Sequence, residues 1–157
     1  MSISAEQYNQ ALLLVLDELF DNVHGFFLDR GTSFFETLAT IPAEQASIRV
    51  GGQCATLAAQ VEHVAFYLDV VVRVIRYGEY LQVDWDKIWR TVSVVTPAQW
   101  EAIQGRLRAS YVGVQELINS TTAWPTEREI GGAIGLIAHT AYHLGEVRQA
   151  LCTLRTN

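Results

Sequence analysis

The sequence predicts an all-α domain in which four long helices surround one core. Half of its 157 residues are hydrophobic and only three are proline, so long stretches can continue as helix without interruption. Apolar residues recur at intervals of three and four in four separate stretches, as they do when one face of a helix is buried. The length suits one domain with a substantial core, and we expect residues 1–157 to form a single domain.

Charge and composition argue against several classes of function. The net charge is −6 and the pI is near 5.1. Lysine and arginine do not cluster, so no nucleic-acid partner is expected. The first ten residues have neither a basic start nor an apolar signal core, and the longest uncharged run is too short to span a membrane. Cys54 and Cys152 are too few for a disulfide framework. These features predict a cytoplasmic protein with no membrane partner.

The first long helix is expected from about Ser4 to Phe27, followed by a short helix over residues 33–40. The turn-forming residues 29–32 separate the two helices, and Thr32 is expected to be the N-cap of the second. A proline and a glycine pair mark residues 41–53 as a connection. The core face of the first helix is predicted to contain Tyr8, Leu12, Leu16, Leu19, Val23 and Phe26.

The second long helix is expected from about Thr56 to Arg76 and the third from Thr96 to about Asn119. Thr96 as N-cap, then a proline and a glutamine, is a good helix start signal. Residues 77–95 form a long connection, whose tryptophans Trp85 and Trp89 are expected to cap one end of the bundle or fill an interface. A polar and aromatic strip borders the core face of the second helix, where a bundle helix can contribute to a site. It contains Thr56, Gln60, His63, Tyr67 and Val74.

The fourth helix, from about Arg128 to Arg155, carries the most unusual stretch of the chain. Much of it contains no carboxylate, lysine or arginine, so it is predicted to be buried on nearly every side. His139 and His143 lie one helical turn apart on one face and can reach a single metal ion. Gly132 and Gly135, beside them, are expected to leave room for a pocket. An opposite apolar stripe is predicted to face the core: Ile130, Ile134, Ile137, Ala141 and Leu144.

His63, His139 and His143 are three of the four histidines in the chain. Each lies in the middle of a predicted helix beside an apolar stripe. Neutral imidazole is a common ligand of transition metals, and three protein ligands with one open position are typical of a catalytic metal site. The alternative is that these are core histidines with ordinary hydrogen-bond partners. The spacing alone leaves both interpretations open.

The order of these motifs resembles that of the DinB superfamily. The sequence HTAYHLGE at residues 139–146 follows an earlier helix that contains VEH at residues 61–63. Residues 29–38 and the Asp84-Trp85 pair are also similar to one DinB-like subgroup. The resemblance covers nearly the whole chain. It implies an up-down-down-up four-helix bundle, a divalent metal on the three histidines, and often a homodimer.

By position, the metal ligands that the resemblance implies are His63, His139 and His143. Close relatives often have a further histidine one turn before the first of these, where this chain has Gln60, so no fourth histidine ligand is expected. Three histidines suit zinc, nickel, iron or copper, with nickel or zinc expected first and iron next. The superfamily includes transferases and isomerases that use small bacterial thiols, which makes such a thiol a candidate cosubstrate.

The supporting residues are less sharply defined by the sequence. Glu146, two turns beyond the first histidine of the pair, is a candidate to accept an imidazole N–H or to act as a base on metal-bound water. The alternative is a salt bridge to Arg128 or to another helix. Tyr67, one turn after the histidine of the second helix, and Gln60 are candidates for binding the substrate. A half-buried core tyrosine is the alternative for Tyr67. His24 is expected to be structural or exposed.

Two functional hypotheses follow. The first is a metal-dependent enzyme that acts on small molecules, of the thiol S-transferase or hydrolase type. The second is a metal-binding or interaction bundle without turnover, such as a stress-related dimer. A solvent path to the open coordination position would favour the first, and a closed site would favour the second. The uncharged fourth helix and the tryptophans near helix ends also predict a homodimer: Trp85, Trp89 and Trp124.

Overall fold

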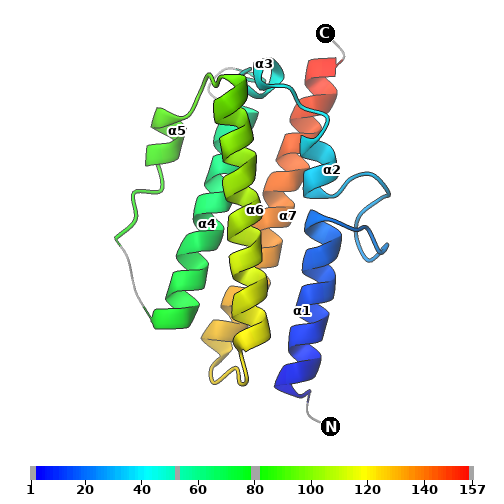
Figure 1. Ribbon diagram of the computed structural model, residues 1–157, viewed down its shortest axis with the longest axis vertical. Coiled ribbons are helices and arrows are strands. Elements are labelled where there is room, and N and C mark those ends of the chain that lie inside the picture. The colour runs from blue at the N-terminus through cyan, green and yellow to red at the C-terminus, as the bar shows by residue number, and fades with distance from the viewer. Residues whose placement is uncertain (1–2, 52–53, 79–81, 156–157) are drawn as a thin grey trace.

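The computed structural model describes residues 3–51, 54–78 and 82–155, so parts of two predicted connections, residues 52–53 and 79–81, lie outside the described residues. Within this part of the chain there is no strand, only an isolated bridge between Arg49 and Thr56. The predicted all-α class is confirmed. The long helices are α1 (Ala5–Phe20), α4 (Leu57–Tyr77), α6 (Pro97–Ser120) and α7 (Glu127–Arg155) (Figure 1). The short helices in the connections are α2 (Phe34–Leu38), α3 (Ala43–Ala46) and α5 (Lys87–Thr91).

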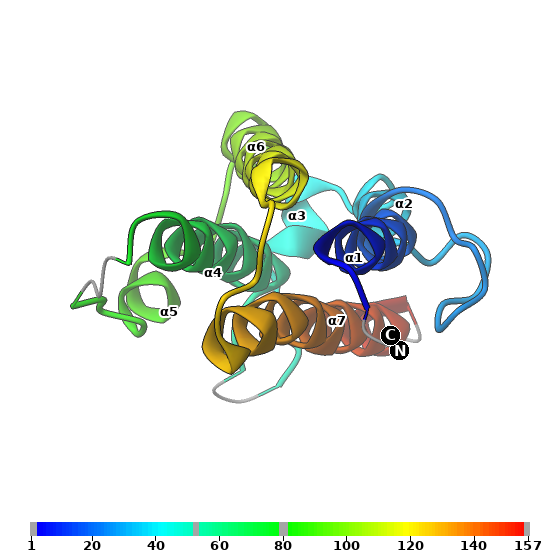
Figure 2. The ribbon, with the colours of Figure 1, turned by 90° about the horizontal axis from the view of Figure 1, so that it is seen from below.

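The long helices pack around a common core. α4 contacts α6 and α7, and α1 contacts the same two helices, an arrangement that Figure 2 shows in end view. The colour order in Figure 1 shows that α1 and α7 run in one direction and α4 and α6 in the other. The two helices that carry the three histidines, α4 and α7, are therefore antiparallel neighbours.

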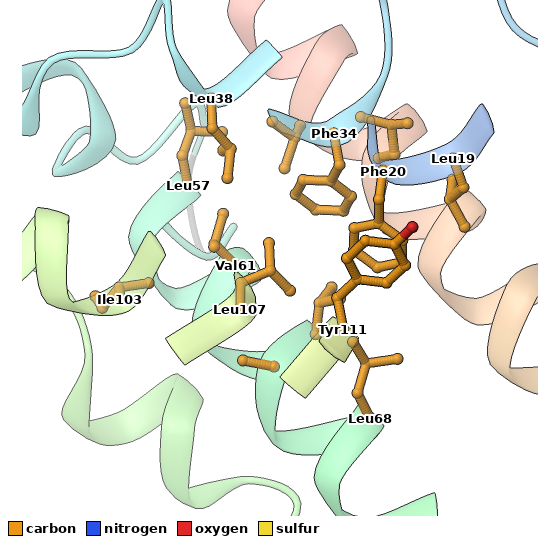
Figure 3. Close-up of a cluster of buried hydrophobic side chains, with 14 of the residues drawn as sticks. Leu19, Phe20, Phe34, Leu38, Leu57, Val61, Leu68, Ile103, Leu107 and Tyr111 are labelled. Atoms are coloured by element: carbon orange, nitrogen blue, oxygen red, sulfur yellow. The ribbon is translucent and has the colours of Figure 1, made fainter. Parts of the chain in front are cut away.

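Large apolar side chains fill the space between the helices (Figure 3). The ring of Phe20 from α1 stacks on Phe34 from α2 and on Tyr111 from α6, with centroid separations of 5.9 and 4.3 Å. Leu68 from α4 and Leu144 from α7 are also fully buried. Burying a side chain of this size contributes about 1.5–3 kcal/mol to folding. The packing of these residues fixes α4 against α7, and with it the relative positions of the histidines.

The starts of two helices show how local sequence determines their bounds. At α6, the hydroxyl of Thr96 accepts a bond from the N–H of Gln99, whose side chain accepts one from the N–H of Thr96. The predicted capping box is confirmed. At α2 the prediction was one residue early, because Ser33 is the N-cap in place of Thr32. The carboxylate of Glu36 accepts bonds from both the N–H and the hydroxyl of Ser33.

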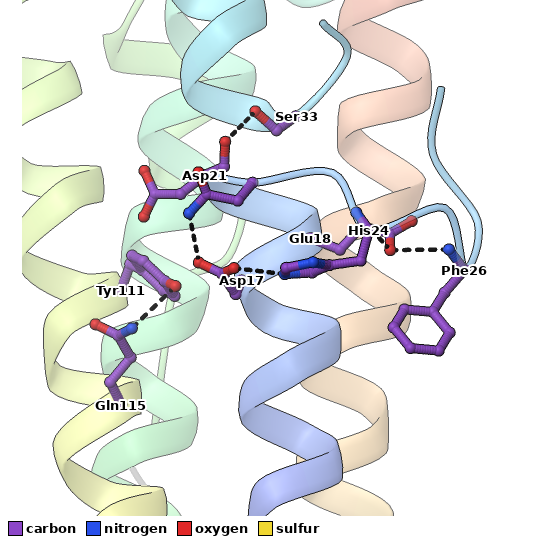
Figure 4. Close-up of polar contacts among 9 residues, drawn as sticks. Asp17, Glu18, Asp21, His24, Phe26, Ser33, Tyr111 and Gln115 are labelled. Atoms are coloured by element: carbon purple, nitrogen blue, oxygen red, sulfur yellow. Dashed lines mark hydrogen bonds and ion pairs between the residues drawn. The ribbon is translucent and has the colours of Figure 1, made fainter. Parts of the chain in front are cut away.

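The first helix ends at Phe20 and not at Phe27, because Glu18 in its last turn binds the chain that follows (Figure 4). The fully buried carboxylate of Glu18 accepts bonds from the backbone N–H groups of residues 24, 26, 27 and 28. Burial raises the pKa of Glu18, but these four bonds outweigh it, so the net pKa lies below its ordinary value. Phe26, predicted to face the core, is instead 62% exposed.

The predicted core stripe of the fourth helix was only partly right. Leu144 is buried and Ile137 and Ala141 are half-buried against the core, whereas Ile134 is 53% exposed. Because both faces of this helix are largely uncharged, hydrophobicity did not identify the inner one. No helix in the described part of the chain combines the length and the apolar character needed to cross a bilayer. The buried positions of α7 are Ala133, Leu136, Thr140, His143, Leu144, Val147 and Leu151.

Candidate metal centre

Three histidines from two helices converge between α4 and α7. His63 comes from α4, and His139 and His143 lie one turn apart on α7. One nitrogen of each ring lies within 4.8 Å of the nitrogens offered by the other two. The Nε2 atoms of His63 and His139 are 3.1 Å apart, and the ring centroids of His139 and His143 are 4.5 Å apart. The predicted convergence of the three histidines is confirmed, and the set can hold one metal ion.

The surroundings keep all three imidazoles neutral near pH 7. Burial, and then the neighbouring histidines, lower the pKa of His63 to about 4, against a smaller raising effect of Glu146. Burial and then His143 lower the pKa of His139 to about 4. Burial also lowers the pKa of His143, although Glu146 acts in the opposite direction. Neutral imidazole nitrogens are the donors that divalent transition metals bind, so the three residues fit such an ion.

The ring of His143 is oriented by two acceptors. Its Nδ1 lies 2.6 Å from Oε1 of Gln60 and 2.9 Å from Oε2 of Glu146. Because both partners are oxygens, Nδ1 carries the proton and Nε2 keeps its lone pair for a metal. The other carboxylate oxygen of Glu146 accepts a bond from the hydroxyl of Tyr142 at 2.7 Å. The bond from Glu146 to an imidazole was anticipated from the sequence. Its role as a base remains a prediction.

Tyr67 lies against a metal-ligand candidate. Its ring stacks on His139, with centroids 3.8 Å apart and an interplanar angle of 29°, and burial raises the pKa of its phenol. A Cβ atom at Gly135 would lie 3.8 Å from the Tyr67 hydroxyl, and one at Gly132 would lie 3.5 Å from Ile75. An added Cβ would therefore make only ordinary van der Waals contact with α4 at either position. Neither glycine lines the two hollows near the histidines, so the expectation that they open a pocket is not supported.

Trp89 is a site residue that the sequence did not identify. Its ring packs against His63 in a tilted arrangement, with centroids 4.4 Å apart and an interplanar angle of 30°. Trp85 lies further away, with its ring centroid 6.3 Å from that of His63 and 6.1 Å from that of Tyr67. The sequence predicts that both tryptophans cap one end of the bundle or fill an interface. Trp89 lies in α5 and Trp85 precedes that helix, so no helical spacing in the sequence connects either of them with His63. Trp124 is separate from the site, and its indole N–H donates to Asn9.

A hollow of about 330 Å³ adjoins the histidine cluster. It reaches His143 and is lined by Arg49, Gln60, Trp89, Tyr142 and Glu146. A second hollow of about 480 Å³ shares Gln60, Tyr142 and Glu146 with the first and continues along α7. Tyr67 lines neither, so its predicted contact with a substrate is not supported by this geometry.

The remaining histidine and the cysteines lie outside the cluster. His24 lies in the loop after α1, and its Nε2 atom is 2.6 Å from a carboxylate oxygen of Asp17 in that helix (Figure 4). Cys54 lines the second hollow, and Cys152 is exposed on α7. Neither cysteine joins the group of possible metal ligands found among the described residues.

Comparisons of the chain with protein-family models, with curated proteins and with solved structures found no match. The interpretation of the histidine cluster therefore depends on its geometry and on the motifs in the sequence.

Proposed function

We propose that the chain is a DinB-like protein that binds a divalent transition metal through His63, His139 and His143. Three neutral imidazoles whose nitrogens converge support the metal. The directions of the long helices support the up-down-down-up topology of that superfamily. Nickel and zinc are the first candidates and iron the next, and metal analysis of the purified protein would identify the ion.

We further propose that the site is catalytic and acts on a small molecule. The observation that carries this proposal is the hollow that reaches His143, because a purely structural metal site is closed by protein ligands. A divalent ion held by three histidines supplies Lewis acidity at a position open to a substrate or a thiol. Thiol S-transfer and hydrolysis are the two reaction types that this chemistry favours.

The protein residues have separate parts in this proposal. Glu146 and Gln60 hold the ring of His143 in one orientation. Tyr67 and Trp89 cover faces of His139 and His63 and keep water from them. Glu146 also lines the hollow, where its carboxylate can accept a proton from a substrate or a thiol.

A cobalt-substituted protein tests the hypothesis that the metal centre binds a small thiol. Adding a small thiol such as 2-mercaptoethanol should produce the charge-transfer absorption of sulfur bound to cobalt, and the His143→Ala protein should not show it. The absence of a spectral change at millimolar thiol would reject the hypothesis of a thiol transferase. The remaining hypotheses would be a hydrolase and a non-catalytic metal-binding protein. A survey of ester and amide hydrolysis would then separate those two.

The lowered pKa values predict how the stability of the metal-free protein depends on pH. The unfolded chain takes up protons on its histidines below about pH 6.5, whereas folded His63 and His139 do so only near pH 4. The unfolded state thus binds more protons in this window, so stability should fall as the pH drops from about 6.5 towards 4. Melting temperatures measured over this range should show the decline, and His63→Ala should make it shallower. An equally steep decline in that variant would contradict the assignment.

We propose in addition that the protein forms a homodimer through the outer face of α7. This face has no charged residue between positions 131 and 145, and it exposes Ile134 and Ala138. Light scattering at micromolar concentration should give a dimer mass for the natural sequence and a monomer mass for Ile134→Asp. A monomeric natural protein would reject this proposal without affecting the metal centre.

A further inference from the structure

Arg49 is held beside the histidine cluster by its own backbone and side chain. It forms the isolated antiparallel bridge with Thr56, the N-cap of α4. Its Nη1 atom donates to the carbonyl oxygen of Cys54 at 3.2 Å. These two contacts fix a guanidinium group at the start of the helix that carries His63, although Arg49 belongs to a connection and not to a helix.

Arg49 is exposed, and it borders the hollow that reaches His143. Arg49 lines this hollow together with His143, Trp89 and Glu146. Among the described residues that line this hollow or the one adjoining it, Arg49 is the only lysine or arginine. It forms no ion pair with a carboxylate in the described part of the chain. A guanidinium group has five N–H donors, so most of its donors remain for another partner.

Gln60 provides a second donor group in the same place. Its Oε1 atom is occupied by His143, whereas its amide N–H groups have no protein partner within the described residues. Arg49 and Gln60 therefore both offer N–H donors to one hollow. Carboxylates bind such donors through both oxygens, and a charged acceptor makes each bond stronger.

The charges in the hollow are compatible with an anion. Glu146 is the one carboxylate among the residues that line it, and its two oxygens already accept bonds from His143 and Tyr142. A divalent ion on three neutral histidines adds two positive charges, and Arg49 adds a third. With the ion bound, the net charge of the ion, Arg49 and Glu146 together would be +2. Such a site attracts an acidic ligand and repels a basic one.

From these contacts we infer that Arg49, assisted by Gln60, binds a carboxylate group of the substrate. The substrate class is then a small organic acid whose reacting group lies at the metal. The adjoining hollow has apolar side chains for its carbon chain, from Val50, Leu57 and Ala150. This inference rests on the proposed metal centre and adds to it the class of molecule that the centre receives.

Hydroxamates test the inference because they bind divalent metals without any catalysed reaction. The probes are the monohydroxamates of succinic, glutaric and adipic acid, each paired with its uncharged methyl ester. Dissociation constants are measured on the cobalt-loaded protein from its visible spectrum. For at least one chain length the acid should bind about tenfold or more tightly than its ester, as expected for hydrogen bonds to a charged group.

Three variants separate recognition by Arg49 from general attraction to the metal. Arg49→Gln should reduce the preference for the acid to the small remainder caused by the ion itself. Arg76→Gln removes the same charge from an exposed position in the last turn of α4 and should leave the preference unchanged. Arg49→Lys should restore part of it, because lysine keeps the charge but not the paired donors.

The outcomes distinguish this inference from the proposed function. Equal binding of acids and esters, or a preference that survives in Arg49→Gln, would overturn the inference while the metal centre stands. Failure of the natural protein to take up cobalt would overturn both, and a metal titration before the hydroxamate series identifies that case.

Discussion

Alanine in place of His63, His139 or His143 should lower the affinity for a divalent metal by more than about a hundredfold. Replacing a residue that only orients a metal ligand already costs 10–100-fold, and each of these substitutions removes a ligand itself. The three histidines come from α4 and α7, and their nitrogens converge within 4.8 Å. Loss of any one leaves two donors and a site that water can enter. Metal titration of each variant, followed by calorimetry or by competition with a chelator, measures the effect.

His24→Ala is the matched control for this series. His24 lies in the loop after α1, where its ring is bound to Asp17 of that helix, away from the cluster, so its removal should leave metal affinity unchanged. Gln60→Ala and Glu146→Ala should have intermediate effects of about 10–100-fold, because both residues orient His143. A His63→Ala protein that binds metal as tightly as the natural sequence would show that the centre is assembled from other residues.

The pair His139 and His143 could be found in the sequence because its signal is local, whereas His63 was added to it through the resemblance to one superfamily. Two residues four apart on a helix share a face whatever the rest of the chain does, and the motif around them resembles one superfamily. The start of α6 was predictable for the same reason, since Thr96 and Gln99 make their bonds to each other. Information carried by neighbours along the chain was sufficient for these features.

The partners of the histidines depend on contacts between distant segments. Trp89 reaches His63 from α5, at the end of a long connection whose path is determined by packing. Arg49 reaches the same region through a bridge to Thr56. No periodicity in the sequence relates these residues to the cluster. The end of α1 was missed for a similar reason, because the apolar period continues past Phe20 while Glu18 binds the following loop.

The inner face of α7 could not be identified from its composition. In an amphipathic helix, charged residues on the exposed face reveal which face is buried. Much of α7 has no charged residue on any face. Its inner face even includes the polar residues Thr140 and His143. Thr140 is accommodated because its hydroxyl donates to the carbonyl oxygen of Leu136. Packing against the other helices therefore determines which face of α7 is buried.

Leu144→Asp and Ile134→Asp should have opposite outcomes, although both place a carboxylate in the same uncharged helix. Leu144 is 1% exposed within the core, so its replacement would bury an unpaired charge without hydrogen-bond partners. A loss of about 4 kcal/mol or more, or failure to fold, is expected. Ile134 is 53% exposed, and its replacement should change the free energy of unfolding of the single protomer by no more than about 1 kcal/mol, apart from the contribution that dimer formation makes to the natural protein.

Urea unfolding of both variants, followed by far-ultraviolet circular dichroism at equal protein concentration, measures the difference. The Ile134→Asp protein should be helical and unfold cooperatively, even where its dimer dissociates. The stripe predicted from the sequence places Ile134 and Leu144 together in the core, and on that basis both substitutions would be equally damaging. Equal losses would therefore favour the predicted stripe over the observed register. A large loss for Leu144→Asp alone means that α7 turns the face with Thr140 and His143 inward, as the metal centre requires.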